Sequence, residues 1–228
     1  MKLLTQNSKI VNSGLTHGYN IYNFGITAAK YCPFKGKCAI EGGCYAQQGA
    51  YIWGNVAPVF EKRGILTQTD QFIPDMSKEI DNKYKRLKDN NKLAIRIHDS
   101  GDFYSVEYLD KWLSIIRNFS KVTFYAYTKS IPIIKLRDIP NNFTTIFSEG
   151  GSVDHLIDRT KDRHSRVFGS LEELLVNGYE NCTKDDAMAF LGDNHRKGLV
   201  YHGAKLKEWT TDQNLDNIEK TVNALYRS

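Results

Sequence analysis

The chain has 228 residues, of which 41% are hydrophobic, and it carries a formal net charge of +5. This length and apolar fraction suit a single α/β domain, which we expect to span residues 1–228. No run of about 18 apolar residues occurs, which argues against a membrane helix, and residues 1–14 lack a signal-peptide pattern. We therefore expect a cytoplasmic protein without a membrane partner. The modest positive charge is compatible with nucleic acid but does not require it.

Residues 1–30 are rich in turn-forming residues and are expected to form an irregular arm or short strands. Three of the four cysteines follow close together, with five residues between each and the next. In a reducing compartment, clustered cysteines indicate metal binding, and thiolates are preferred by zinc and by iron–sulfur clusters. We therefore predict a metal-binding cysteine loop over residues 31–53, with a helix beginning near its end. The predicted ligands are Cys32, Cys38, Cys44 and Cys182, with His195 or His202 as alternatives to Cys182.

Helices and strands alternate in the middle of the chain. Apolar residues at helical spacing predict a surface helix over Met76–Asn90. Leu93–Ile97 alternates apolar and polar residues, as a half-buried strand does, and a helix capped by Ser105 follows. Val122–Thr128 and Thr144–Ser148 read as further strands. Strands joined by helix-length connections favour a parallel sheet, so we expect a complete or partial (β/α) TIM-like barrel.

Beyond Val153 the chain becomes more charged. Residues 158–166, DRTKDRHSR, are expected to form an exposed helix or loop face, with phosphate contacts as the alternative. A short helix is expected over Leu171–Leu175. An apolar stripe over residues 215–226 predicts a C-terminal helix that caps the barrel.

Polar groups follow each of the three predicted strands. The carboxyl ends of parallel strands meet at one edge of the sheet, where α/β proteins bind ligands. Carboxylates there can act as general acid, general base or nucleophile, so Asp99, Asp102 and Glu149 are the catalytic candidates. The alternative for Asp102 is a turn residue that caps the next helix. The substrate-binding candidates are His98, Ser100, Gly101, Phe103, Lys129, Gly150 and Gly151.

Three stretches carry a family resemblance. CPFKGKCAIEGGCYAQQGAY, RIHDSGDFYSVEYLDKWLSI and VTFYAYTKS together resemble the phage gene-product-88-like family, over roughly residues 20 to 200.

A shorter segment points to a chemistry. Asp99–Phe103, DSGDF, is similar to the DSGGF segment of queuine-type tRNA-guanine transglycosylases and to DSGAF in their DNA-modifying phage relatives. This resemblance implies a zinc-containing TIM barrel that exchanges guanine for a 7-deazaguanine by double displacement, here in DNA rather than tRNA. It implies that Asp99 contacts the base and transfers protons, while Glu149 or Asp102 attacks the sugar carbon. The chain departs from the pattern at Asp102, which replaces a small residue, and in its upstream cysteines.

A rival resemblance comes from the end of the cysteine loop. Cys44-Tyr45-Ala46 is similar to the loop of phage proteins with half-barrels like those of radical enzymes, whose cysteines also precede the first barrel strands. It implies a [4Fe-4S] cluster and S-adenosylmethionine, although the spacing differs from the C-x3-C-x2-C of radical S-adenosylmethionine enzymes. A third hypothesis is a non-catalytic, zinc-containing nucleic-acid-binding protein that uses the basic residues between Arg159 and Arg166.

Overall fold

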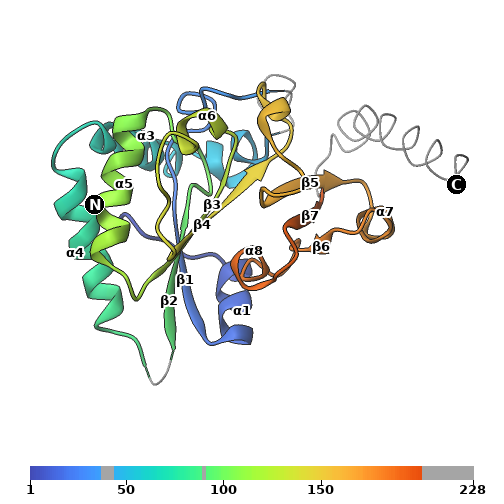
Figure 1. Ribbon diagram of the computed structural model, residues 1–228. Helices are drawn as coiled ribbons and strands as arrows, with labels where there is room; N and C mark the ends of the chain where they lie inside the picture. The colour runs from blue at the N-terminus through green and yellow to red at the C-terminus, as the bar shows by residue number, and fades with distance from the viewer. Residues whose placement is uncertain (37–43, 89–90, 202–228) are drawn as a thin grey trace, which may run out of the picture.

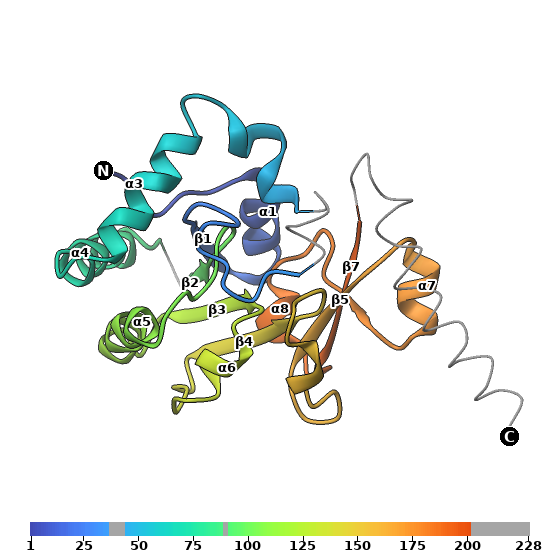
Figure 2. The ribbon, with the colours of Figure 1, turned by 90° about the horizontal axis from the view of Figure 1, so that it is seen from above.

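The computed structural model describes residues 1–36, 44–88 and 91–201. At its centre is a seven-stranded sheet in the order β1-β2-β3-β4-β5-β7-β6, in which all neighbouring strands are parallel. The sheet curls into a half-barrel (Figures 1 and 2). The strands are β1 (Tyr19–Phe24), β2 (Lys92–Ile97), β3 (Thr123–Thr128), β4 (Phe143–Ser148), β5 (His164–Phe168), β6 (Glu180–Asn181) and β7 (Arg196–Val200).

Helices cover both faces of the curled sheet (Figure 2). On the convex side, α4 and α5 pack through a large core that includes Phe24, Phe72 and Trp112. On the concave side, α1 and α8 bring Ile10 and Ala189 against the inner residues of β1 to β4. The helices are α1 (Ser8–His17), α3 (Ala57–Thr67), α4 (Phe72–Tyr84), α5 (Val106–Asn118), α6 (Ile131–Ile134), α7 (Leu171–Val176) and α8 (Met188–Leu191), with 3-10 turns η1 (Tyr45–Gln47), η2 (Gly49–Ile52) and η3 (Asp154–Leu156). No helix in these described parts is long and apolar enough to cross a membrane.

The predicted fold class, a partial barrel of parallel strands, is confirmed. The three expected strands occur as β2, β3 and β4, they are parallel, and the barrel is partial. Ser105 caps α5, since its side chain accepts a hydrogen bond from the backbone N–H of Tyr108. The short helix after residue 170 occurs as α7. The predicted C-terminal cap over residues 215–226 lies outside the described residues.

Other local predictions are wrong. Residues 8–17 form α1 rather than an irregular arm or a strand, with Asn7 as N-cap and Gly18 in the left-handed conformation at the other end, whereas a short strand of the kind expected in residues 1–30 does occur as β1. The helix expected near residues 46–53 is replaced by η1 and η2, because the chain is extended at Gln48 and left-handed at Gly49. The strand β2 is buried on both faces rather than one, since α1 and α8 cover its concave side.

Further along the chain, two more bounds change. The helix expected over residues 76–90 begins earlier, at Phe72, and ends at Tyr84. The charged segment 158–166 is not one exposed face, because its last three residues enter the sheet as part of β5. His164 and Ser165 are buried there.

Candidate functional site

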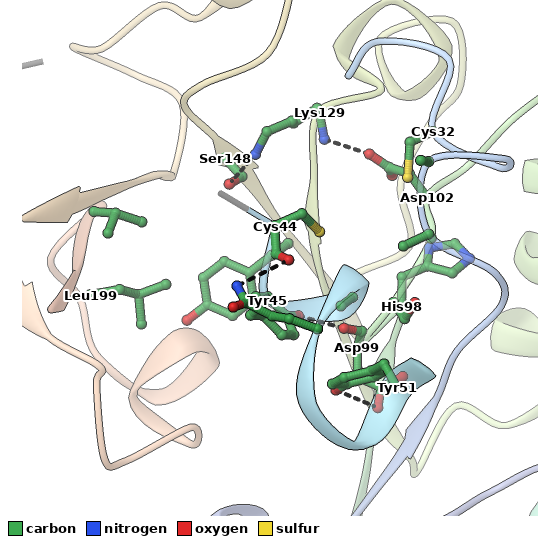
Figure 3. Close-up of a pocket in the computed structure, with 18 of the residues that line it drawn as sticks. Cys32, Cys44, Tyr45, Tyr51, His98, Asp99, Asp102, Lys129, Ser148 and Leu199 are labelled. Carbon is green, nitrogen blue, oxygen red and sulfur yellow. Dashed lines mark hydrogen bonds between the residues drawn. The ribbon is translucent and has the colours of Figure 1, made fainter. Parts of the chain in front are cut away.

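A pocket of about 730 Å³ lies at the carboxyl ends of the strands. The polar groups that follow β2, β3 and β4 share this edge, as the strand order requires (Figure 3). Phe103, Gly150, Gly151 and Cys182 do not line it, and Cys38 lies outside the described residues. The predicted site residues that do line it are Cys32, Cys44, His98, Asp99, Ser100, Gly101, Asp102, Lys129 and Glu149.

Asp99 is a buried carboxylate with few hydrogen-bond donors. One carboxylate oxygen, Oδ2, accepts hydrogen bonds from the Asn23 amide and, at 3.4 Å, from the Tyr51 hydroxyl. The other oxygen, Oδ1, is buried without a hydrogen-bond partner among the described residues. Burial raises the pKa of Asp99 to about 6, against the opposing effect of the Arg96 guanidinium. Asp99 is therefore suited to exchange protons near neutral pH.

Asp102 is held by three donors. Its carboxylate accepts hydrogen bonds from the Thr128 hydroxyl at 2.6 Å and from the backbone N–H groups of Phe103 and Lys129, both at 2.8 Å. Burial raises the pKa of Asp102, and these hydrogen bonds act in the opposite direction. The carboxylate thus joins the end of β2 to the end of β3. A carboxylate bonded in this way is less available as a nucleophile than the sequence led us to expect. The bonding fits the alternative of a turn residue, and it also links that turn to β3.

Glu149 is also fully paired. Its two carboxylate oxygens accept from Arg159 at 3.1 Å and from Arg166 at 2.7 Å. Two of the basic residues that could have contacted phosphates therefore neutralise a pocket carboxylate instead. To act as a nucleophile, Glu149 would have to break one of these ion pairs.

His98 lines the pocket but packs mainly against the core, and Phe103 lies wholly in the core. The Nε2 atom of His98 lies 2.9 Å from the Tyr108 hydroxyl, and its ring meets that of Phe103 edge-on at 4.5 Å. Burial lowers the pKa of His98 to about 3, so the ring is neutral at physiological pH. The backbone of His98 is left-handed, with φ of 64°, where the chain turns from β2 into the pocket edge. Both residues therefore support the site through their packing.

The residues between the two aspartates fix the loop after β2 to the segment after β1. The Ser100 hydroxyl donates to the carbonyl of Ile26 at 2.8 Å. Gly101 has φ of 79°, and a Cβ there would lie 2.3 Å from the Ile26 side chain. Gly101 is therefore required by backbone conformation and close packing, and its role here is structural.

The two glycines after β4, Gly150 and Gly151, contact the start of the cysteine loop. Lys35 and Gly151 form an isolated antiparallel bridge, and the N–H of Ser152 donates to the Phe34 carbonyl at 3.1 Å. A Cβ on Gly36 would lie 2.4 Å from the Gly150 carbonyl oxygen, so the two segments touch through their backbones. The structure thus places the two glycines under the loop and not among the pocket-lining residues, where a substrate-binding role would require them.

Two of the predicted metal ligands, Cys32 and Cys44, line the pocket (Figure 3). Cys182 is fully buried and outside its lining, and burial raises the pKa of its thiol to about 12. No group of three potential ligands that could hold a metal occurs among residues 1–36, 44–88 and 91–201. The structure therefore does not bring Cys182 to the other two cysteines. A site that includes Cys38 stays a prediction.

Several pocket residues were not predicted. The Tyr45 hydroxyl donates to the backbone carbonyl of Asp99 and so ties the residue after Cys44 to the end of β2. Arg96 reaches from β2 into the concave side and pairs with Asp186 at 3.1 Å. Burial alone would raise the pKa of Asp186, but Arg96 and Lys9 lower it to about 2. The sequence did contain a signal for Arg96, because a charged residue within the otherwise apolar strand KLAIRI indicates a buried partner.

Comparisons with known proteins agree on the family. Residues 1–217 match the family described as gene product 88. A 64-residue stretch is 39% identical to the Gene 88 protein of Mycobacterium phage D29, and it covers 28% of this chain and 24% of that protein. No solved structure matches the chain. The chain therefore belongs to the gene product 88 family, as the resemblance in its sequence predicted.

Proposed function

We propose that this protein is an enzyme whose active site is the pocket of the half-barrel, with an iron–sulfur cluster held by Cys32, Cys38 and Cys44. The observation that carries the proposal is that Cys32 and Cys44 both line the pocket that contains Asp99. The cysteine loop also follows β1, the first strand of the half-barrel. When bound, such a cluster would supply single electrons to a ligand in the pocket. The resemblance to the half-barrels of radical enzymes implies that this ligand is S-adenosylmethionine.

The donor set suits this group better than a four-cysteine zinc site. Thiolates, not thiols, bind metals, and the Cys182 thiol is buried with a raised pKa away from the pocket. This leaves the three loop cysteines as the soft ligands. Asp99 takes or returns the substrate proton, since its pKa of about 6 permits both forms near neutral pH. Tyr45 positions Asp99 through its backbone carbonyl.

The test is the iron, sulfide and zinc content of the full chain purified without oxygen, together with its visible absorption spectrum. We expect a coloured protein with iron and sulfide. Cys32→Ala and Cys44→Ala should lose both, whereas the matched control Cys182→Ala should retain them. A colourless protein with stoichiometric zinc, or loss of iron only in Cys182→Ala, would contradict the proposal.

A second candidate is base exchange of the guanine transglycosylase type on DNA, with zinc in the loop. The raised pKa of Asp99 favours it, because the same carboxylate would protonate the departing base and deprotonate the incoming one. It ranks second because both nucleophile candidates, Asp102 and Glu149, are fully bonded. The measurement is incorporation of labelled guanine or a 7-deazaguanine into DNA. Incorporation by the wild type that Asp99→Asn abolishes would establish it over the first candidate.

A further inference from the structure

The cations that line the pocket fall into two groups. Arg96 and Lys9 form ion pairs with the same buried carboxylate, that of Asp186, at 3.1 and 2.9 Å. Lys35 and Lys129 form no ion pair with any residue of the described chain. The first pair is therefore neutralised by Asp186, whereas no carboxylate of residues 1–36, 44–88 and 91–201 pairs with the second.

The backbones of Lys35 and Lys129 lie close together. Lys35 is the bridge partner of Gly151, and a Cβ on Gly151 would lie 3.2 Å from the Cβ of Lys129. The backbones of the two lysines therefore flank the same glycine at the pocket mouth. The Lys35 ammonium group donates to the carbonyl of Ala29, which also lines the pocket, at 3.1 Å, and an anion bound in the pocket would offset charge on both lysines.

Lys129 is also held in place. Its backbone N–H is bonded to Asp102, and its ammonium group donates to the Ser148 hydroxyl at 2.9 Å. Figure 3 shows this side chain running along the pocket from the end of β3 to Ser148. A cation fixed beside a hydroxyl is a preorganised site for a phosphate oxygen.

The wall across the pocket from Asp99 is apolar. Val167 of β5 and Leu199 of β7 line it, and in Figure 3 Leu199 lies on the other side of Tyr45 from Asp99. With a volume of about 730 Å³, the pocket can hold a molecule much larger than a free phosphate ion.

We propose that the pocket binds a nucleotide, with its phosphate on Lys129, Lys35 and Ser148 and its base against the wall of Val167 and Leu199. This inference rests on the proposed function only in taking the pocket as the active site. It names the substrate class of that site.

The test is calorimetric titration of the full-length protein with each of the four ribonucleoside 5′-monophosphates and with the matching nucleosides. At least one monophosphate should bind more tightly than its nucleoside. Lys129→Gln should weaken that binding roughly tenfold and leave nucleoside binding unchanged, because it removes one charged hydrogen bond to the phosphate. The matched control is Lys85→Gln, at an exposed lysine that pairs with Asp81 on α4. It should bind as the wild type does.

Two results would overturn the inference. One is that no monophosphate binds more tightly than its nucleoside, and the other is that Lys129→Gln binds the monophosphates as tightly as the wild type. Iron content measured on the same preparations separates this failure from that of the proposed function. A protein without iron that shows Lys129-dependent nucleotide binding would sink the cluster and keep the nucleotide.

Discussion

The two sides of the pocket treat their carboxylates differently. On the β3–β4 side, Asp102 accepts three hydrogen bonds and Glu149 pairs with two arginines. On the β1–β2 side, Asp99 receives donors from the described part of the chain on one oxygen only. All three carboxyl groups are buried and line the same pocket. The difference therefore lies in their bonding and not in their exposure.

This contrast separates carboxylates that hold the site together from one that is available for chemistry. A buried carboxylate surrounded by donors has its charge offset, and removing it leaves those donors without partners. A buried carboxylate with few donors keeps a high affinity for a proton, and the fold gains little from its charge. Variants at these positions should therefore differ in what they damage.

The largest expected effect is on stability at Asp102. Asp102→Ala leaves the Thr128 hydroxyl and two backbone N–H groups without their acceptor, so the free energy of unfolding should fall by about 3–5 kcal/mol. Urea unfolding at neutral pH measures it, with Asp99→Asn as the comparison. A loss at Asp99→Asn equal to or greater than that at Asp102→Ala would break the contrast.

The next effect is a pH dependence at Asp99. Its pKa rises from 3.8 unfolded to about 6 folded, so its contribution to stability is full below pH 3.8 and is lost as the pH rises through 6. Relative to Asp99→Asn, the wild type should lose about 3 kcal/mol of unfolding free energy across this window. Buried His98 acts in the opposite direction, but it does so in both proteins and cancels in the difference. Parallel stability curves for the two proteins would show that the Asp99 pKa is not raised.

The smallest effect is at Tyr45, whose hydroxyl ties the residue after Cys44 to the Asp99 carbonyl. Tyr45→Phe removes this hydrogen bond, worth about 1 kcal/mol, together with a longer one from Arg96 at 3.4 Å, and should speed alkylation of Cys44 about fivefold through local opening. Mass spectrometry of metal-free protein treated with iodoacetamide measures the rate. Tyr51→Phe is the control, since its hydroxyl contacts the Asp99 side chain at 3.4 Å rather than the backbone. Equal rates in both variants would remove Tyr45 as a positioning residue.

Local signals in the sequence predicted the parts of the fold that depend on local interactions. Alternation predicted β2, and the N-cap residue Ser105 predicted the start of α5. Because the sheet is parallel, these elements also placed Asp99, Lys129 and Glu149 at one edge. The helix α1 was missed although it has both an Asn cap and a final glycine, since of the residues that it buries, Ile10, Ser13 and Gly14, only one has a large apolar side chain.

The rest depends on residues distant in the sequence. The strand β5 reads as a charged segment because Arg166 carries a charge that Glu149 neutralises only in the fold. The role of Asp102 was equally hidden, since two of its three donors come from residues 128 and 129, at the end of β3. The sequence motif identifies the carboxylate residue, but the hydrogen-bond donors around that carboxylate come from segments that only the tertiary structure brings near.

The strand order also shapes how the chain assembles during synthesis. Strands β1 to β5 can each join the growing sheet as they emerge, because each pairs with the one before it. The exception is β7, which must enter between β5 and β6. Until Arg196–Val200 has been made, β5 presents an unpaired edge, which is the kind of surface on which nascent chains aggregate. The part of the pocket that Leu199 lines therefore forms only after β7 has joined the sheet, and the proposed nucleotide site is incomplete until then.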